Sequence, residues 1–350
     1  MKRSRLAIAS LWPLGVALAV LLPAGGASGQ TPWTKYAGNP VLEVGAPGEW
    51  DAGVVDHSEV IFDGLTYHMW YGGGLVFHQS DIGYATSTDG VHWDKWPGNP
   101  VVVRGAPGDW DGGHIQPGAV LWDGATFHMW YGGCVSGDLG PCATGYATSP
   151  DGVTWTKDPG NPVLTVGNAG SWDSLVALIT AVVVEGEGFR YWYWGGATTS
   201  TFAIGYASST DGKWPEPVFW PRTSGWDRHT IAFPMVVFEG GAYHMWYSGG
   251  PGICNAIGHA VSADGINWAR QPLWEPVLPR GAAGTWDVGC IFSPRVVLEG
   301  DTAHMWYDGI NNQDVFAIGY ATAPLPFPEA WLFADDFESG DTSTWSATVP

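Results

Sequence analysis

The chain has 350 residues, with 14 Lys and Arg against 34 Asp and Glu, and a formal net charge of −20 at pH 7. A surface this acidic repels phosphate backbones and anionic lipid, so nucleic acid is excluded as an expected partner. The charge favours neutral or cationic substrates.

The first residues are typical of an export signal. Three basic residues precede the apolar run 6–22, and Ala27-Ser28-Gly29 offers the small residues of a cleavage site before Gln30. Pro13 interrupts the run, which is shorter than the ~20 residues that a membrane span usually needs. We expect residues 1–29 to be a signal peptide and the mature protein to be secreted or periplasmic, with no membrane association after cleavage. A retained anchor or a lipid-linked form is the alternative.

One pattern then recurs five times. A Trp-Asp dipeptide begins at Trp50, Trp110, Trp172, Trp226 and Trp286. Twenty residues after each of these comes a second Trp, at Trp70, Trp130, Trp192, Trp246 and Trp306. A Gly-Tyr-Ala sequence or a close relative of it follows at Gly83, Gly145, Gly205, Gly258 and Gly319. Five copies in register indicate a repeat architecture.

Each copy is predicted to form four short strands. In the first copy they are Ser58–Phe62, Thr66–Tyr71, Ile82–Ser87 and Val91–Lys95, rich in aromatic and β-branched residues. Asp-Gly pairs separate the first strand from the second and the third from the fourth. These pairs favour tight hairpins, because glycine adopts the positive φ that such turns need.

The two ends of the repeat complement each other. Trp33-Thr34-Lys35 matches the fourth strand of other copies, whereas the last copy stops after its third strand at Ala321. The N-terminal segment can supply the missing strand and close a ring, which hides the sheet edges. We therefore predict an all-β fold: a five-bladed β-propeller over residues 30–323, with four antiparallel strands per blade and the ring closed by the N-terminal strand. Residues 324–350 are expected to be a C-terminal tail, and the protein a monomer.

Four cysteines fit an oxidising compartment. Cys134 and Cys142 enclose a short loop and are suited to a disulfide across a hairpin, which leaves Cys254 and Cys290 as a second pair. Four cysteines allow three pairings, and the sequence alone leaves them open.

The repeat also separates scaffold from candidate site. His68, His128, His244 and His304 share one repeated strand position and are interpreted as structural, as are most of the Trp residues. The loops between second and third strands, and the crossings between copies, vary in length and must share one face of the disc. Variable loops on a rigid scaffold commonly carry the site. The non-repeated polar residues predicted to bind substrate there are His78, His114, Gln116, Arg228, His229, Arg295, Asn312 and Asp314.

The repeated motifs resemble a known superfamily. Tyr-His-Met-Trp-Tyr-Gly at 67–72 and Ile-Gly-Tyr-Ala-Thr-Ser at 82–87 look like the five-bladed glycoside hydrolases of families 32, 43, 68, 117 and 130, over about residues 33–323. The Ser-x-Asp-Gly-x-x-Trp turn at 87–93 also resembles the Asp-box of sialidases. Five repeats, and Asp directly beside Gly, argue against that second relative.

The resemblance implies three carboxylates around the axis, on the first strands of the first three blades. One acts as base or nucleophile, one as general acid, and one positions the sugar. The matching positions in this chain are His57, Pro117 and Leu178, and none of them is a carboxylate.

Asp56 lies one residue from the expected base position, and a β-bulge could restore its direction. We therefore hypothesise that Asp56 is the base and Glu59 the second carboxylate of the first blade. His57, His114 or His229 would replace the missing acid, because an imidazole titrates near neutral pH.

The resulting prediction is a secreted, glycoside hydrolase-like propeller that acts on oligo- or polysaccharide with a non-standard acid/base set. The alternative is a non-catalytic glycan-binding propeller without the catalytic carboxylates. No cofactor is expected. An axial divalent cation held by His and carboxylates is a third reading, but no metal-ligand spacing supports it.

Overall fold

The structure is a computed structural model that describes residues 33–327, apart from 138–139, 253–254 and 326. All regular elements in this part of the chain are β-strands, as predicted. The predicted signal peptide, residues 1–29, lies outside the described residues, and so does most of the predicted tail. Within the described part, no helix is long and apolar enough to cross a membrane.

Twenty of the twenty-two strands form five successive antiparallel units. Unit one contains β3 (Val54–Phe62), β4 (Tyr67–Gly74), β5 (Asp81–Ser87) and β6 (Asp94–Lys95). Unit two contains β7 (His114–Trp122), β8 (Phe127–Cys134), β9 (Cys142–Ser149) and β10 (Thr156–Lys157). Unit three contains β11 (Val176–Glu185), β12 (Gly188–Gly196), β13 (Ala203–Ser208) and β14 (Gly212–Lys213).

Unit four contains β15 (Thr230–Glu239), β16 (Ala242–Gly250), β17 (Ala256–Ser262) and β18 (Ala269–Arg270). Unit five contains β20 (Cys290–Glu299), β21 (Thr302–Ile310), β22 (Phe316–Pro324) and, from the other end of the chain, β1 (Thr34–Lys35). Two short strands lie beside these units: β2 (Leu42–Glu43) pairs with β22, and β19 (Leu278–Pro279) pairs with β17.

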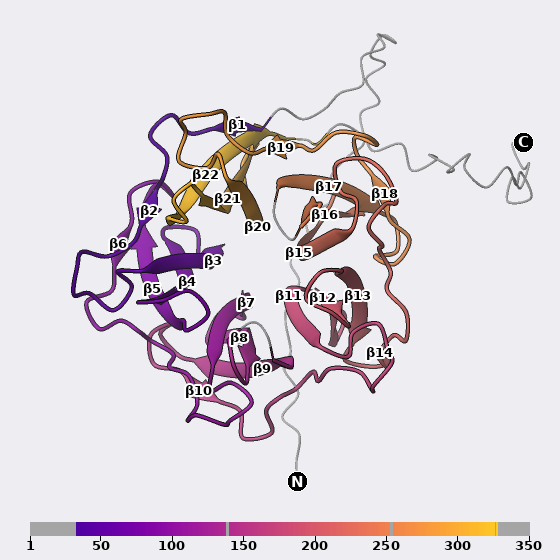
Figure 1. The fold of residues 1–350 in the computed structure, drawn as a ribbon, viewed down its shortest axis with the longest axis horizontal. Helices are drawn as coiled ribbons and strands as arrows, with labels where there is room; N and C mark the ends of the chain where they lie inside the picture. The colour runs from indigo at the N-terminus through magenta and orange to yellow at the C-terminus, as the bar shows by residue number, and fades with distance from the viewer. Residues whose placement is uncertain (1–32, 138–139, 253–254, 326, 328–350) are drawn as a thin grey trace, which may run out of the picture.

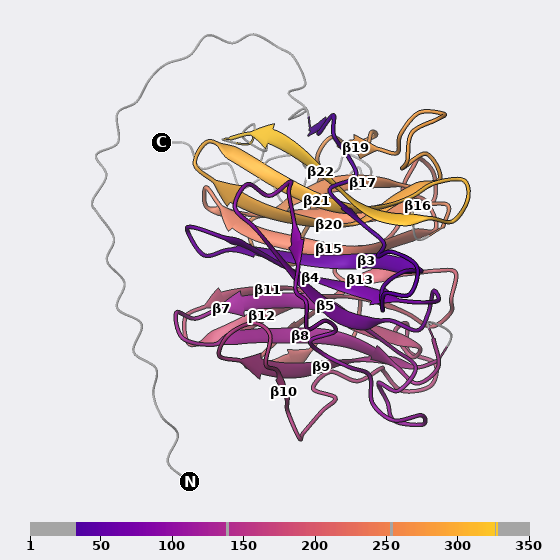
Figure 2. The ribbon, with the colours of Figure 1, turned by 90° about the vertical axis from the view of Figure 1, so that its left-hand side faces the viewer.

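The units stand side by side around a common centre (Figure 1). Their first strands, β3, β7, β11, β15 and β20, lie innermost; each contacts the next, and β20 contacts β3. Seen from the side, the innermost strands run across the thickness of the disc (Figure 2).

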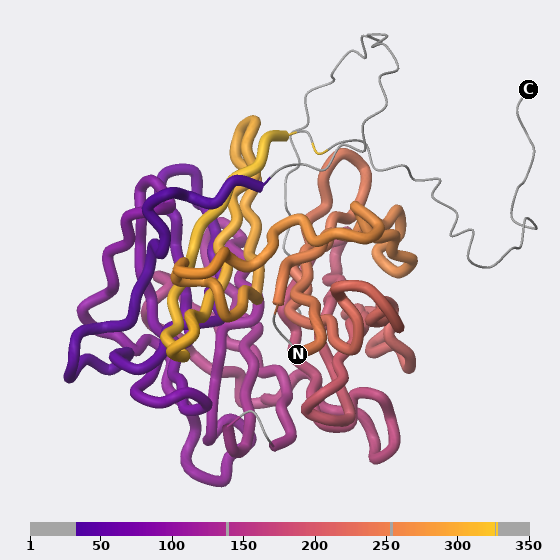
Figure 3. The backbone as a smooth tube through the Cα atoms, turned by 45° about the horizontal axis from the view of Figure 1, so that its top comes forward, coloured from indigo at the N-terminus to yellow at the C-terminus, as the bar shows by residue number. Residues whose placement is uncertain are grey.

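The two ends of the repeat meet in unit five. Thr34 pairs with Thr322 and Lys35 with Ala321 in antiparallel register. The indigo start of the described chain lies beside its yellow end in Figure 3. Lys35 Nζ also lies 2.5 Å from the buried carboxylate of Asp287. The N-terminal strand therefore occupies the position that is β6 in unit one.

The Trp-Asp repeat is explained by a buried three-residue contact. In unit one, Asp51 Oδ2 accepts a hydrogen bond from Tyr71 at 3.0 Å and lies 2.7 Å from Lys95 Nζ. The corresponding sets in the other units are Asp111–Tyr131–Lys157, Asp173–Tyr193–Lys213, Asp227–Tyr247–Arg270 and Asp287–Tyr307–Lys35. The Asp–Tyr hydrogen bond requires the spacing of twenty residues, and the cation pairs the otherwise uncompensated buried charge.

The repeated second Trp joins neighbouring units. The indole Nε1–H of Trp70 in unit one donates to the carbonyl of Gly152 in unit two at 2.8 Å, and Trp192 donates similarly to Gly265. Trp306 of unit five donates to Gly90 of unit one at 2.9 Å. These Trp side chains are scaffold, as the sequence indicated.

In unit one, three strand bounds differ from the prediction by more than one residue. The second strand ends at Gly74 rather than Tyr71. The first strand begins at Val54 rather than Ser58, because its inner end pairs with the Gly-rich end of β4. The fourth is limited to Asp94–Lys95, because the side chain of Asp89 accepts the backbone N–H groups of Val91 and His92 and holds them in a turn.

Candidate functional site

Every inner strand has a register irregularity at the same point. In β3 it falls between Asp56 and Glu59, where His57 has a φ of 49°. The other four lie at Pro117/Ala119, Ile179/Ala181, Ala232/Met235 and Phe292/Arg295. A bulge re-aims the side chains beside it. The bulge considered for Asp56 from the sequence is therefore present, and it turns the side chain of His57 toward the axis.

A cavity of about 220 Å³ lies at the axis, among the inner strands and the loops that join second to third strands. Aromatic side chains dominate its wall: Phe77, Trp194, Phe202, Phe233, Phe292 and Phe316. The polar side chains in the wall are His57, His78, Gln116 and Thr199. Among the described residues, no Asp or Glu lines this cavity.

His57 forms one wall of the axial cavity. Its ring packs against Phe233 and Phe292, with centroids 5.2 and 5.6 Å away. Its backbone N–H donates to Asp308 Oδ2 at 2.7 Å, and its Nδ1 lies 3.1 Å from Asp56 Oδ1. His57 therefore separates the cavity from two buried carboxyl groups.

Asp56 and Asp308 lie behind His57 and are both fully buried. Asp56 Oδ1 sits over Gly72, where an added Cβ would approach it to 2.6 Å, so this position requires glycine. Burial raises the pKa of Asp308 to about 7, and the negative charge of Asp56 adds to the shift, while His57 opposes it. One acidic proton is thus retained near neutral pH beside the cavity but outside its wall.

Glu59 is paired inside the protein. Its Oε2 lies 2.5 Å from Nε of Arg295, and both side chains are buried. Burial raises the pKa of Glu59 to about 7, although Arg295 opposes the shift. Glu59 and Arg295 are predicted site residues; the structure pairs them with each other, and neither lines the cavity.

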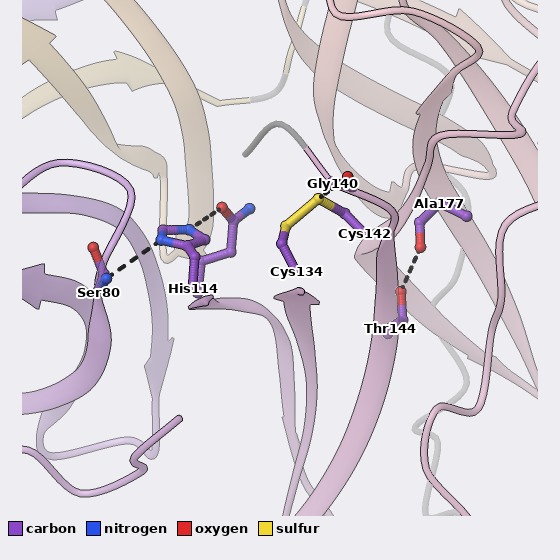
Figure 4. Close-up of a disulfide and its surroundings, with 8 residues drawn as sticks. Ser80, His114, Cys134, Gly140, Cys142, Thr144 and Ala177 are labelled. Carbon is purple, nitrogen blue, oxygen red and sulfur yellow. Dashed lines mark hydrogen bonds between the residues drawn. A yellow bond between two sulfur atoms is a disulfide. The ribbon is translucent and has the colours of Figure 1, made fainter. Parts of the chain in front are cut away.

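His114 and Gln116 form a second polar patch. Nδ1 of His114 accepts the backbone N–H of Ser80 at 3.4 Å, and Nε2 lies 3.1 Å from Gln116 Oε1 (Figure 4). The imidazole orients the amide, which faces the cavity. The predicted disulfide between Cys134 and Cys142 is confirmed and forms part of the same wall. Cys290 is disulfide-bonded as well, and its predicted partner lies outside the described residues.

Of the remaining predicted site residues, one lines the cavity and four do not. His78, in the loop after β4, lines the cavity. Arg228, His229, Asn312 and Asp314 are not in the cavity wall, and all four are exposed. Of the three positions where the resemblance implies carboxylates, His57 and Leu178 line the cavity and Pro117 does not. No described residue of the wall supplies a carboxyl group in their place.

The alternative of an axial cation finds no support in this part of the molecule. Within the described residues, no group of three or more His, Cys, Asp or Glu has the arrangement of a metal site. The polar side chains nearest the axis are instead paired with one another or with backbone groups.

Sequence reasoning missed Asp308 and the aromatic wall. Asp308 follows the repeated Tyr of β21, at a position occupied in the other copies by Gly72, Gly132, Trp194 and Ser248. A charged residue in that otherwise small or apolar position breaks the repeat, and that signal could have identified it. The Phe residues come from loops and strands distant in sequence, with no shared motif.

Several solved structures share this fold. A structure of the GH130 family of mannoside phosphorylases and glycoside hydrolases is 17% identical, covering 86% of this chain and 98% of its own, with a TM-score of 0.63. A glycosyl hydrolase from Bacteroides ovatus is also 17% identical with the same coverage and a TM-score of 0.61. An N-acetylgalactosamine deacetylase from F. plautii, solved with blood group B trisaccharide, is 18% identical with a TM-score of 0.58, covering 82% and 96%.

Two curated relatives are closer in sequence. Both are uncharacterized proteins of Mycobacterium tuberculosis, from strains CDC 1551 / Oshkosh and ATCC 25618 / H37Rv. Each is 30% identical over 223 residues, which is 60% of this chain and 72% of the relative. No protein-family model matches the chain. The chain therefore belongs to the family of these two mycobacterial proteins, and its fold is that of the glycoside hydrolase-like propellers.

Proposed function

We propose that the five units are the blades of one closed propeller domain, residues 30–323, which β1 completes. The pairing of β1 with β22, the Lys35–Asp287 ion pair and the Trp306–Gly90 hydrogen bond support closure between the last unit and the first. The disulfide supports export to an oxidising compartment, with residues 1–29 removed as a signal peptide. We further propose that the protein acts as a monomer.

We propose that the axial cavity binds one sugar-sized group of a carbohydrate without hydrolysing it. The observation that carries this proposal is the absence of Asp and Glu from the described cavity wall. Most glycoside hydrolases use two carboxyl groups that flank the scissile bond. Here Asp56, Glu59 and Asp308 are buried behind the wall.

The wall suits the apolar face of a sugar ring. Aromatic side chains pack against C–H faces, and the few polar groups fix orientation. His57, His78 and Gln116 supply those polar groups. A volume of about 220 Å³ is below the usual range of ligand pockets, so the ligand is a terminal residue rather than an internal stretch of chain.

A second candidate is the glycoside hydrolase with a non-standard acid/base set. One observation favours it: the Asp56–Asp308 pair, in which Asp308 keeps its proton to a pH of about 7. Two carboxyl groups with separated pKa values are the usual basis of acid and base roles. In this reading His57 moves aside to expose the pair to substrate.

The test is a glycan-array screen of the purified mature protein, followed by incubation of the protein with each bound glycan and with a panel of aryl glycosides. The binding proposal predicts saturable binding to a defined terminal sugar, with no shortened product by mass spectrometry. Gln116→Ala should weaken binding by roughly five-fold, because it removes one hydrogen bond.

Asp56→Asn and Asp308→Asn separate the two candidates. Neither substitution should change the products under the binding proposal. Product release by the wild type that either variant abolishes would overturn the binding proposal in favour of the hydrolase. Binding to no glycan at all, with no turnover, would contradict both.

A further inference from the structure

An outer groove lies between units two and three and shares no lining residue with the axial cavity. In four units, a Trp from the fourth strand or its turn packs edge-on against the repeated Trp of the preceding unit. The four pairs are Trp155 on Trp70, Trp268 on Trp192, Trp93 on Trp306 and Trp33 on Trp246, with ring centroids 5.8–6.2 Å apart. Each pair covers the repeated Trp of the preceding unit. Outside Trp33 a groove of about 630 Å³ remains, and Trp246 is not in its wall.

Unit three breaks this pattern because its last hairpin is shorter. In unit two Ala147 pairs with Lys157, ten residues later, whereas in unit three Ala207 pairs with Lys213, six residues later. Four residues of the hairpin are therefore missing, and the Trp two positions before the paired lysine is among them. Trp214 follows that lysine and packs on Tyr206 of its own unit instead, at 5.5 Å.

At this boundary the groove has a volume of about 840 Å³, and its wall includes the repeated Trp itself, Trp130. Its aromatic walls are Tyr146, Phe189, Tyr191 and the partly exposed Trp214. The structure thus contains, at one of its five unit boundaries, an aromatic-walled groove in which no described indole of the next unit covers the repeated Trp.

The indole of Trp130 supplies the hydrogen-bonding group of this groove. Its counterparts Trp70, Trp192 and Trp306 donate Nε1–H to a glycine carbonyl in the turn of the next unit. The shortened turn of unit three brings no such carbonyl to Trp130, and no acceptor for its Nε1–H is recorded among the described residues. The group nevertheless lies at the groove wall, where a bound molecule can accept its hydrogen.

We propose that this groove is a binding site for a small, neutral aromatic molecule the size of an indole ring that carries a hydrogen-bond acceptor. The ring takes the position that a Trp side chain holds at the other boundaries, edge-on to Trp130, and the acceptor receives the Trp130 Nε1–H. Edge-to-face packing and the burial of apolar ring surface provide the binding energy. The strongly negative protein charge favours a neutral ligand over a carboxylate.

The probes are indole and quinoline, because quinoline has a ring nitrogen that accepts a hydrogen bond and indole does not. Isothermal titration should give saturable binding of both, with a dissociation constant below about 1 mM for quinoline. In ¹H–¹⁵N spectra, the Trp130 indole resonance should shift with quinoline. Methyl glucoside serves as the comparison ligand and should produce no saturable signal at this groove.

Two variants test the assignment. Trp130→Phe keeps an aromatic ring but removes the indole N–H donor. It should therefore weaken the binding of quinoline by roughly five-fold and leave the binding of indole nearly unchanged. The second replaces residues 210–212 with residues 150–156, which restores the longer hairpin and its Trp. This graft should abolish binding of both probes and raise the melting temperature, because the inserted indole fills the groove.

Unchanged quinoline binding by the folded graft variant would overturn the proposal, as would a lack of saturation by either probe on the wild type. If methyl glucoside shifts the Trp130 resonance and the aromatic probes do not, the groove binds sugar and the proposal is wrong. Should the graft not fold, the Trp130→Phe result decides alone. None of these outcomes depends on the axial cavity.

Discussion

The outer and inner parts of the units differ in what they repeat. At the outer strands, all five units contain the same Asp–Tyr–cation set, and three of them donate an indole hydrogen bond to the following unit. At the axis, the units share only a bulge in the first strand, and the residues around it differ in every unit. The comparison indicates that the repeated residues hold the ring together. The non-repeated residues determine what the axis can bind.

Truncation should affect the repeated region most strongly. Removing residues 33–43 deletes β1 and β2 and leaves Asp287 without its cation. We expect the melting temperature to fall by more than about 10 °C, because the edge of β22 is exposed and the buried charge of Asp287 is left unpaired. Differential scanning calorimetry measures it. The variant Lys35→Met, which keeps the strand, should produce a smaller drop; a truncated chain melting within about 3 °C of the wild type would refute closure by β1.

A pair of Trp substitutions compares a filled boundary with the open one. Trp306 is fully buried and donates to Gly90, so Trp306→Ala should lower the free energy of unfolding by about 3–5 kcal/mol. Trp130 borders the open groove, so Trp130→Ala should have a clearly smaller effect. Urea denaturation gives both values. Equal losses would mean that the boundary between units two and three is as well packed as the others.

The buried ion pair under the axis can be tested by a double-substitution cycle. Arg295→Met or Glu59→Leu alone leaves one buried charged group without its partner, and each should destabilise the protein by about 3 kcal/mol at pH 7.5. The combined variant should be more stable than either single one, because neither member of the pair is left buried without its partner. Additive losses in urea denaturation would show that the pair is not coupled.

The pH dependence of Asp308→Asn is a smaller effect. The folded-state pKa of Asp308 is about 7, above its ordinary value of 3.8, because burial favours the neutral carboxyl group. Its contribution to the free energy of unfolding is therefore present at pH 4 and lost as the pH rises through 7. Asn stays neutral throughout. The melting temperature of the variant relative to wild type should therefore be higher at pH 8 than at pH 5, by roughly 2–4 °C. The exposed control Asp94→Asn should show no such trend, and a pH-independent difference for Asp308→Asn would contradict the assignment.

The scaffold could be predicted from the sequence because its contacts are copied. The interval between Asp51 and Tyr71 recurs in every unit, so five occurrences supported the same inference. The pairing of Lys35 with the last unit followed from the match between two chain ends. The turn at Asp89 was placed correctly, but its side-chain hydrogen bonds shorten the fourth strand in a way that propensity alone does not indicate.

The axial site was predicted only in part. Asp56, His57, His78 and Gln116 were selected as non-repeated polar residues, and the structure brings them to or beside one cavity. Whether a side chain at a bulge faces the cavity or lies behind its wall depends on one residue of register, which the sequence does not fix. The open groove, in contrast, was detectable: Lys213 follows Ala207 after six residues, whereas Lys157 follows Ala147 after ten.

The central claim is that ligand binds in the axial cavity and leaves uncleaved. Its most direct test is isothermal titration of the best-binding glycan into wild type, Leu178→Trp and the exposed control Leu65→Trp. Leu178 faces the cavity, so a Trp there fills the space, whereas Leu65 lies on an exposed turn. We predict at least about ten-fold weaker binding for Leu178→Trp alone, with the glycan recovered intact. Equal affinity in all three proteins, or recovery of a shortened glycan, would contradict the account.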